Sequence, residues 1–152
     1  MAGLAPQINI PQLAHLKAIV ISAAWHPEIC DALVVGAVRG FKAAGIGNPT
    51  TRTVAGSFEL PLAAQLAFDE DFDVAVIVGL VLRGETPHFD YVCQGVTQGV
   101  MDVSLSRSKP IGFGVLMCDN LEQASARAGL PGSKEDKGYD SALAALSVVN
   151  KG

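Results

Sequence analysis

Apolar residues along the chain follow two alternating patterns. Four runs rich in β-branched and apolar residues predict strands at residues 17–25, 50–56, 72–82 and 110–118. Between these runs, apolar residues recur at helical spacing. Residues 74–82 include no polar side chain, which is typical of a central parallel strand buried on both faces. The alternation of strands and helices predicts a parallel α/β sheet with helices on both faces.

Helix signals lie between and after these runs. They predict helices at residues 27–45, 60–70, 87–105, 119–129 and 138–150. Asp119 is predicted to cap the fourth helix, with Glu122 three residues later as in a capping box and Gly129 at its end. The polar segment 129–138 is predicted to be a flexible loop. Because the chain shows no linker or repeat, we expect one domain over residues 1–152.

Composition, charge and cysteine spacing indicate which classes of protein the chain can belong to. In a chain of 152 residues, 49% hydrophobic and 17% charged, we expect some apolar side chains to lie in a subunit interface. The net charge of −4 disfavours a nucleic-acid partner. No apolar run is long enough to span a membrane and the N-terminus is unlike a signal peptide, which indicates a cytoplasmic protein. The wide spacing of Cys30, Cys93 and Cys118 favours reduced, buried thiols over a zinc site.

Polar and aromatic residues gather where the predicted strands end. Trp25 and His26 follow the first strand, GSFELP (56–61) follows the second, and RGETPHFD (83–90) follows the third. Ligands of parallel α/β sheets bind beyond the carboxyl ends of the strands. Backbone N–H groups near helix starts in SFE and GET could bind an anion, although neither segment is a P-loop. These segments are therefore the predicted ligand site.

Several side chains have both a chemical and a structural interpretation. His88 can transfer protons near neutral pH, or it can simply occupy a helix start. Glu59 can contact a ligand or be a solvated carboxylate at a helix N-terminus. Arg127 and Lys137 together could hold a phosphate, although a single cation at a helix end or in a loop is usually solvated.

Aromatic residues add a possible surface for a ring. Trp25, Phe58 and Phe113 could form a wall for a flat heterocycle, or each could belong to the core. His15 and His26 are expected to be structural or exposed. From the residues alone we predict an enzyme or a binding protein for a small planar, phosphorylated molecule, while the reaction stays open.

Four motifs resemble those of the lumazine synthase family, whose members catalyse the penultimate step of riboflavin biosynthesis. They are GSFELP, VLRGETPHFDYVCQGVTQGV, PIGFGVLMCDNLEQASARAG and EDKG, and AAWHPEICDAL and RAGLP look closest to actinobacterial members. The resemblance covers nearly the whole chain. It implies a flavodoxin-like, three-layer α/β/α sandwich with a four-stranded parallel sheet. It also implies condensation of 5-amino-6-ribitylamino-uracil with 3,4-dihydroxy-2-butanone 4-phosphate to 6,7-dimethyl-8-ribityllumazine, phosphate and water, without cofactor or metal.

The resemblance also implies site residues, motif by motif. His88 matches the proposed proton-transfer residue, and Phe113 matches an aromatic residue contributed by the neighbouring subunit. Arg127 matches the phosphate-binding arginine, with Lys137 a basic residue close to it. The other implied contacts are to the pyrimidine ring (Trp25 by stacking, Val81 and Leu82 by backbone), the ribityl chain (Ser57, Phe58 and Glu59) and the phosphate (Glu85 and Thr86).

The family resemblance implies a homo-oligomer with active sites shared between subunits, and riboflavin synthase as a possible partner. The segment between Arg127 and Lys137 is longer than the turn of sixty-subunit shells, so we expect a homopentamer. The N-terminal segment 1–16 is expected to contact a neighbour's sheet, although Pro11 would limit strand pairing. Val54 to Gly56 reads VAG where the family often has VPG, and the last helix is expected to be short.

Three other interpretations of the chain stay open. It could be a non-catalytic lumazine or flavin binder of the same fold, but a phosphate site would then have no use. It could be a shell protein that encloses a partner, which the longer loop disfavours. It could be an archaeal-type riboflavin synthase, to which RGETPHFDYV is poorly matched.

Overall fold

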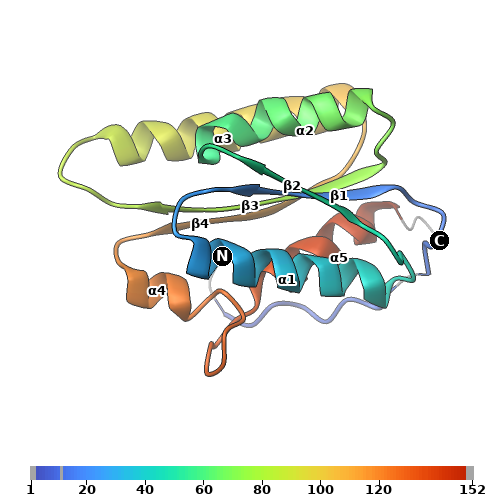
Figure 1. Cartoon of the computed structure of the whole chain (residues 1–152), viewed down its shortest axis with the longest axis horizontal. Helices are drawn as coiled ribbons and strands as arrows, with labels where there is room; N and C mark the ends of the chain where they lie inside the picture. The colour runs from blue at the N-terminus through green and yellow to red at the C-terminus, as the bar shows by residue number, and fades with distance from the viewer. Residues whose placement is uncertain (1–2, 11, 150–152) are drawn as a thin grey trace.

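A computed structural model of the chain describes residues 3–10 and 12–149. Its four strands form one parallel sheet, as the alternating pattern predicted, and the structure gives their order as β2-β1-β3-β4. Helices cover both faces, so the three-layer α/β/α sandwich is confirmed (Figure 1). The elements are β1 (Ala18–Ala23), α1 (Pro27–Ala43), β2 (Thr50–Val54), the 3₁₀ turn η1 (Ser57–Glu59), α2 (Leu60–Asp69), β3 (Val74–Leu82), α3 (His88–Arg107), β4 (Ile111–Cys118), α4 (Leu121–Ser125) and α5 (Lys137–Val149).

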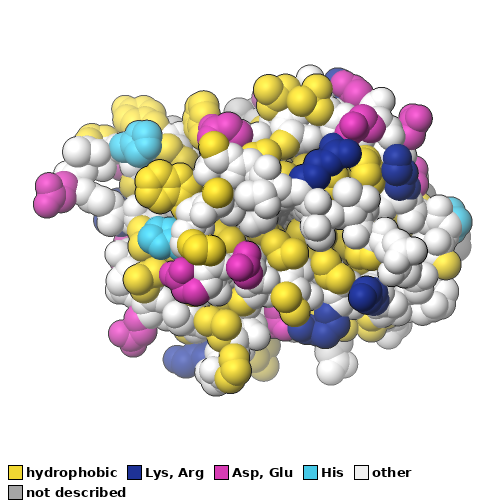
Figure 2. Space-filling model, viewed as in Figure 1, with side chains coloured by type: hydrophobic (Ala, Val, Ile, Leu, Met, Phe, Trp, Pro, Cys, Tyr) yellow, Lys and Arg dark blue, Asp and Glu magenta, His cyan; other side chains and the backbone are white. Residues whose placement is uncertain are grey.

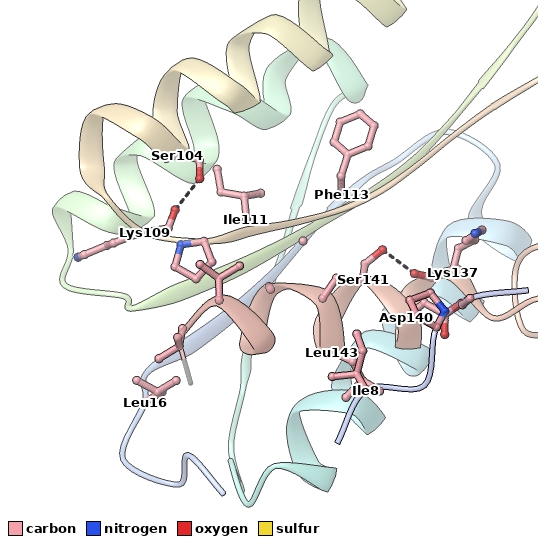
Figure 3. A pocket seen from close by; sticks show the side chains of 18 of the residues that line it. Ile8, Leu16, Ser104, Lys109, Ile111, Phe113, Lys137, Asp140, Ser141 and Leu143 are labelled. Atoms are coloured by element: carbon pink, nitrogen blue, oxygen red, sulfur yellow. Dashed lines mark hydrogen bonds between the residues drawn. The ribbon is translucent and has the colours of Figure 1, made fainter. Parts of the chain in front are cut away.

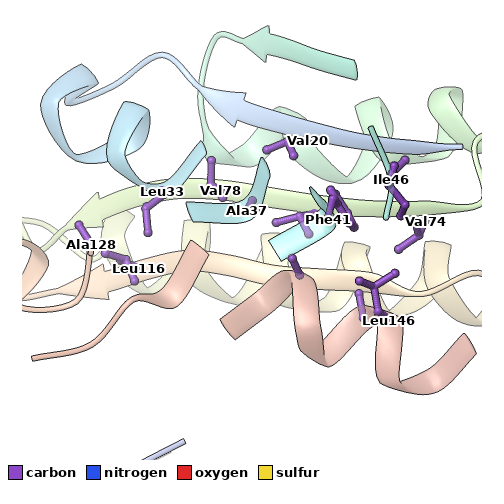
Figure 4. Close-up of a cluster of buried hydrophobic side chains, with 14 of the residues drawn as sticks. Val20, Leu33, Ala37, Phe41, Ile46, Val74, Val78, Leu116, Ala128 and Leu146 are labelled. Carbon is purple, nitrogen blue, oxygen red and sulfur yellow. The ribbon is translucent and has the colours of Figure 1, made fainter. Parts of the chain in front are cut away.

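Alternate side chains of β3 enter two separate cores. Val74, Val76 and Val78 point into a core with α1 and α5, which Figure 4 shows around Leu33, Phe41 and Leu146. Ala75 and Ile77 point to the opposite face, against α2 and α3. Because successive side chains of a strand face opposite ways, a strand without polar residues must be covered on both sides. The prediction for this strand is confirmed.

Glycines allow α1 and α5 to pack closely. A Cβ atom at Gly138 would lie 2.1 Å from the backbone oxygen of Leu33, and one at Gly40 would lie 2.7 Å from the Ala142 Cβ. Arg39 of α1 also forms an ion pair with Asp136, which directly precedes α5. The start of α5 is therefore held against α1 and cannot shift independently of it.

The region after β4 differs from the prediction. Helix α4 begins at Leu121, and its cap is Asn120, whose Oδ1 accepts a hydrogen bond from the Gln123 backbone N–H at 2.9 Å. Asp119 is not the cap, because Arg83 of the β3–α3 turn donates to its carboxylate at 2.9 Å. The expected helix over 119–129 therefore ends at Ser125, and Gly129 instead has a left-handed turn conformation with φ 72°.

Two further predictions about segment 126–138 were wrong. Arg127 lies beyond α4 and not in its last turn, and Lys137 is the first residue of α5 and not part of a flexible loop. The backbone N–H groups of Lys134 and Glu135 donate to Ala126 O, and that of Gly129 donates to Glu135 O. These hydrogen bonds between two segments of the same chain replace the helical hydrogen bonds that would have extended α4.

The N-terminal segment, the cysteines and the last helix bear on other predictions. Residues 3–10 form no strand, and Pro11 lies outside the described residues, so the expected limit on pairing there stays a prediction. Cys30 and Cys118 are buried as expected, whereas Cys93 is only partly buried; burial raises the pKa of the Cys30 thiol to about 11. Helix α5 has 13 residues, and none of the described helices could span a membrane.

Candidate functional site

The carboxyl ends of all four strands meet at one edge of the sheet, at the left of Figure 1. Figure 2, in the same view, shows histidine, acidic and hydrophobic side chains close together at this end of the molecule. The predicted site residues follow the strands in the order of the sheet. Residues after β2 and β1 lie at one side, the turn after β3 lies in the middle, and the segment after β4 lies beyond it.

Trp25 and Glu59 approach each other across Gly56. A Cβ atom at Gly56 would lie 3.4 Å from the Trp25 Nε1 and 3.3 Å from a Glu59 carboxylate oxygen. The Trp25 side chain is 66% exposed, so a face of its ring can take a ligand. His26, next to it, adopts a left-handed conformation at the start of α1, which turns the chain sharply at the end of β1. The structure thus brings the predicted ring-stacking residue and a carboxylate together.

Ser57 and Phe58 are positioned by two glycines of other elements. Ser57 is buried, and its Oγ lies 2.5 Å from where a Cβ of Gly79 would be. Within the described residues this hydroxyl has no hydrogen-bond partner, which is unusual for a buried polar group. Phe58 lies against Gly95 of α3 and stays 61% exposed. This oxygen is fully buried beside β3, so a ligand would contact the neighbouring side chains of Phe58 and Glu59, which are exposed.

The turn after β3 carries the predicted phosphate-side and proton-transfer residues. Val81 and Leu82 are half-buried at the strand end, whereas Glu85, Thr86 and His88 are exposed. The backbone N–H of His88 donates to the Thr86 Oγ1 at 3.4 Å, and His88 is the first residue of α3. The imidazole is therefore presented to solvent at the helix start.

Arg83 holds this turn in place through contacts with three residues, a role that was not predicted from the sequence. Its guanidinium donates to Asp119 at 2.9 Å, lies 3.5 Å from an Asp90 oxygen, and stacks 4.3 Å from the Phe89 ring centre. The hydrogen bond from Arg83 lowers the pKa of the Asp119 carboxyl, with the charge of Arg83 acting in the same direction. Because Phe89 and Asp90 directly follow His88, these contacts fix the position of the first turn of α3.

Arg127 and Lys137 are brought together by the backbone and by a shared carboxylate. The Lys137 N–H donates to Arg127 O at 3.0 Å. The Glu135 carboxylate forms an ion pair with each cation: Arg127 Nε lies 3.5 Å from its Oε2, and Lys137 Nζ lies 3.1 Å from its Oε1. Arg127 also donates to Gln123 O at 2.8 Å. Glu135 was not among the predicted site residues, although its position two residues before Lys137 in EDKG was a usable signal.

Phe113 does not join the other predicted residues within one chain. It pairs with Ile77 in the middle of β4, five residues before the strand ends at Cys118. Figure 3 shows it on the opposite side of β4 from Ser141 and Leu143. It lines an open pocket of about 1240 Å³, together with residues 3–6 and residues of α5 that include Lys137. Its ring is 40% exposed, so it is available to another molecule.

Metal-ligand residues do not cluster in the part of the chain that the structure describes. Within residues 3–10 and 12–149, no three His, Cys, Asp or Glu side chains lie close enough to hold an ion. The groups at the sheet edge are an indole, an imidazole, carboxylates, a buried hydroxyl and two cations. This set can stack a ring, transfer a proton and bind an anion.

The chain is similar to a known family over most of its length. The family model described as 6,7-dimethyl-8-ribityllumazine synthase matches residues 15–152. Relatives with that name include proteins of Paenarthrobacter aurescens (53% identical; 93% of this chain, 88% of the relative), Frankia casuarinae (51%; 98% and 94%) and Streptomyces coelicolor (48%; 95% and 90%). With this sheet and these motifs, the chain belongs to the 6,7-dimethyl-8-ribityllumazine synthase family.

Proposed function

We propose that this protein condenses 5-amino-6-ribitylamino-uracil with 3,4-dihydroxy-2-butanone 4-phosphate to give 6,7-dimethyl-8-ribityllumazine, phosphate and water. It is then a transferase of riboflavin biosynthesis. The observation that carries the proposal is the order of groups along one sheet edge. A stacking surface and a carboxylate follow β1 and β2, an exposed histidine follows β3, and two cations lie beyond β4.

This order suits a ring at one end and a phosphate at the other. We place the pyrimidine against Trp25 and the strand-end backbone of Val81 and Leu82. The ribityl chain would run along Ser57, Phe58 and Glu59, where the exposed Glu59 carboxylate could accept hydrogen bonds from sugar hydroxyls. The phosphate would lie between the turn at Glu85 and Thr86 and the cations Arg127 and Lys137. Neighbouring strands are about 5 Å apart, so four strand ends can accommodate both substrates side by side.

The chemistry requires proton transfers more than it requires a strong nucleophile. The amine of the pyrimidine attacks the ketone and a first water leaves; phosphate is then eliminated, and the ribitylamino nitrogen attacks the remaining carbonyl to close the ring with loss of a second water. His88 is placed to carry these protons, since imidazole titrates near neutral pH. Holding two substrates together supplies much of the rate acceleration. We therefore assign His88 a helpful but not indispensable role.

The active site would be completed by a second copy of the chain. Phe113 lies away from its own strand-end site and is exposed, so it could cover the site of a neighbouring subunit. Large apolar side chains exposed on η1, α2, α3 and β4 could line the same interface, among them Phe58, Leu62, Leu66, Tyr91, Met101, Leu105, Phe113 and Met117. We propose a homopentamer in the cytoplasm, with riboflavin synthase as an open prediction for a partner.

The proposal is tested by mixing the purified protein with both substrates. Lumazine formation is followed by absorbance, and phosphate release is measured in the same reaction. We expect both products in equal amounts. Tight binding of a lumazine or flavin without turnover would instead support a non-catalytic binding protein, and neither turnover nor binding would refute the proposed site.

A further inference from the structure

Glu135 occupies the place between the two cations that the proposed function assigns to phosphate binding. Its two carboxylate oxygens are divided between them, one near Arg127 Nε at 3.5 Å and the other near Lys137 Nζ at 3.1 Å. The Glu135 side chain is 24% exposed, and the Lys137 side chain is 29% exposed. This carboxylate is therefore a partly buried anion held by the same donors that a phosphate would need.

The surroundings explain why an anion is needed there in the free protein. Lys137 is the first residue of α5, where the positive end of the helix dipole disfavours a cation. Arg127 adds a second positive charge beside it. The neighbouring carboxylate of Asp136 is engaged elsewhere, with Arg39 and with the Tyr139 backbone N–H. Glu135 is thus the carboxylate that forms ion pairs with both cations, while Asp140, one turn further along α5, adds negative charge near Lys137.

We propose that Glu135 is an internal competitor of phosphate, an inference that rests on the proposed function. When a phosphate group arrives, its oxygens take the donors of Arg127 and Lys137, and the Glu135 side chain turns away. When phosphate leaves, the carboxylate returns. The exchange lowers the affinity for inorganic phosphate, and so helps the enzyme release this product. It also selects for ligands with more negative charge than one carboxylate.

The backbone around Glu135 allows the side chain to move alone. The Glu135 N–H donates to Ala126 O, and its carbonyl accepts from the Gly129 N–H, both at 3.0 Å. Asp136 continues this contact as a bridge to Ala128. With both backbone groups engaged, exchange requires only rotation of side-chain torsions. Replacing the side chain is therefore expected to leave the fold of segment 126–137 unchanged.

The test uses Glu135→Gln, which keeps the shape and an acceptor oxygen but removes the charge. In the turnover assay we expect the inhibition constant for inorganic phosphate to fall by about 3- to 10-fold, with a fall in KM for the phosphate substrate. A residue that only stabilised the loop would give the opposite direction, because a distorted site binds phosphate more weakly. An unchanged or raised inhibition constant would overturn the proposal.

A matched control and a direct binding measurement complete the design. Glu122→Gln removes the same charge from an exposed position on α4 and should leave both constants unchanged. Calorimetric titration of inorganic phosphate into each protein gives the same comparison without turnover. If the wild type makes no lumazine, the proposed function fails. If it does but Glu135→Gln binds phosphate no more tightly, only the role of Glu135 fails.

Discussion

His88 is the residue whose chemistry matters most to the proposed reaction, and it lies at the first position of α3. We expect His88→Ala to lower kcat by about 10- to 100-fold with a small change in KM, because proton transfer slows while both substrates are still held together. Steady-state kinetics of lumazine formation measures this. His15→Ala, an exposed histidine before β1, is the control and should keep wild-type turnover. Full turnover in His88→Ala would remove the acid/base role.

The ion pair of Arg83 and Asp119 predicts a pH dependence of stability. The hydrogen bond from Arg83 lowers the pKa of Asp119 below its ordinary value of 3.8. A lowered folded-state pKa contributes stability above pH 3.8, and that contribution is lost as the pH falls through the lower folded value. We therefore expect Asp119→Asn to reduce Tm slightly at pH 7, and the difference from wild type to disappear in acid.

The measurement is thermal unfolding of both proteins from pH 7 down to about pH 2. Because both side chains are largely exposed, the effect is expected to be small and to weaken at high salt. A difference in Tm that stays constant over the whole pH range would mean that Asp119 acts through packing and not through its charge.

Among the elements, the contact of α1 with α5 supports the site most directly, since α5 begins at Lys137. We expect Gly138→Ala to lower the free energy of unfolding by about 2–4 kcal/mol, because its Cβ would lie 2.1 Å from the Leu33 backbone oxygen and the helices must separate. The shift of α5 would also move Lys137 and raise KM for the phosphate substrate.

Urea unfolding at fixed protein concentration measures this effect. Gly47→Ala is the matched control, since a Cβ there meets no atom within 4 Å and its φ is not in the left-handed region. We expect it to be close to neutral. Equal stability of the two variants would show that α1 and α5 can separate at little cost, and that their close packing does not hold α5 in place.

At the scale of the whole molecule, segment 130–134 is expected to decide between two assemblies, a pentamer and a sixty-subunit shell. Most of the segment is exposed, and Ser133 Oγ accepts from the Leu130 N–H at 2.9 Å, so it forms an ordered projection beside α4. We expect this projection to block contacts between pentamers. Sedimentation velocity should therefore give a five-subunit particle of the 15.8 kDa chain. A sixty-subunit particle would contradict the prediction.

Local patterns were sufficient for most of the elements and for the sheet edge at which the candidate site lies. Helical and alternating periodicities depend on neighbours a few residues away, so strands, helices and the parallel sheet could be predicted from the sequence. The strand-end rule then placed Trp25, Glu59 and His88 at one edge. Motif similarity contributed the reaction and the assignment of roles, which periodicity could not supply.

The sequence by itself thus determined the layers, the sheet edge that carries the site and the family. Only the tertiary structure decided how distant residues pair there. Arg83 forms an ion pair with Asp119, which lies 36 positions later in the sequence, so Asn120 and not Asp119 caps α4. Backbone pairing of segments 126–129 and 134–137 ends α4 early, starts α5 at Lys137 and brings Glu135 between two cations. Such contacts depend on chain folding in three dimensions, because no local period encodes which distant groups will meet.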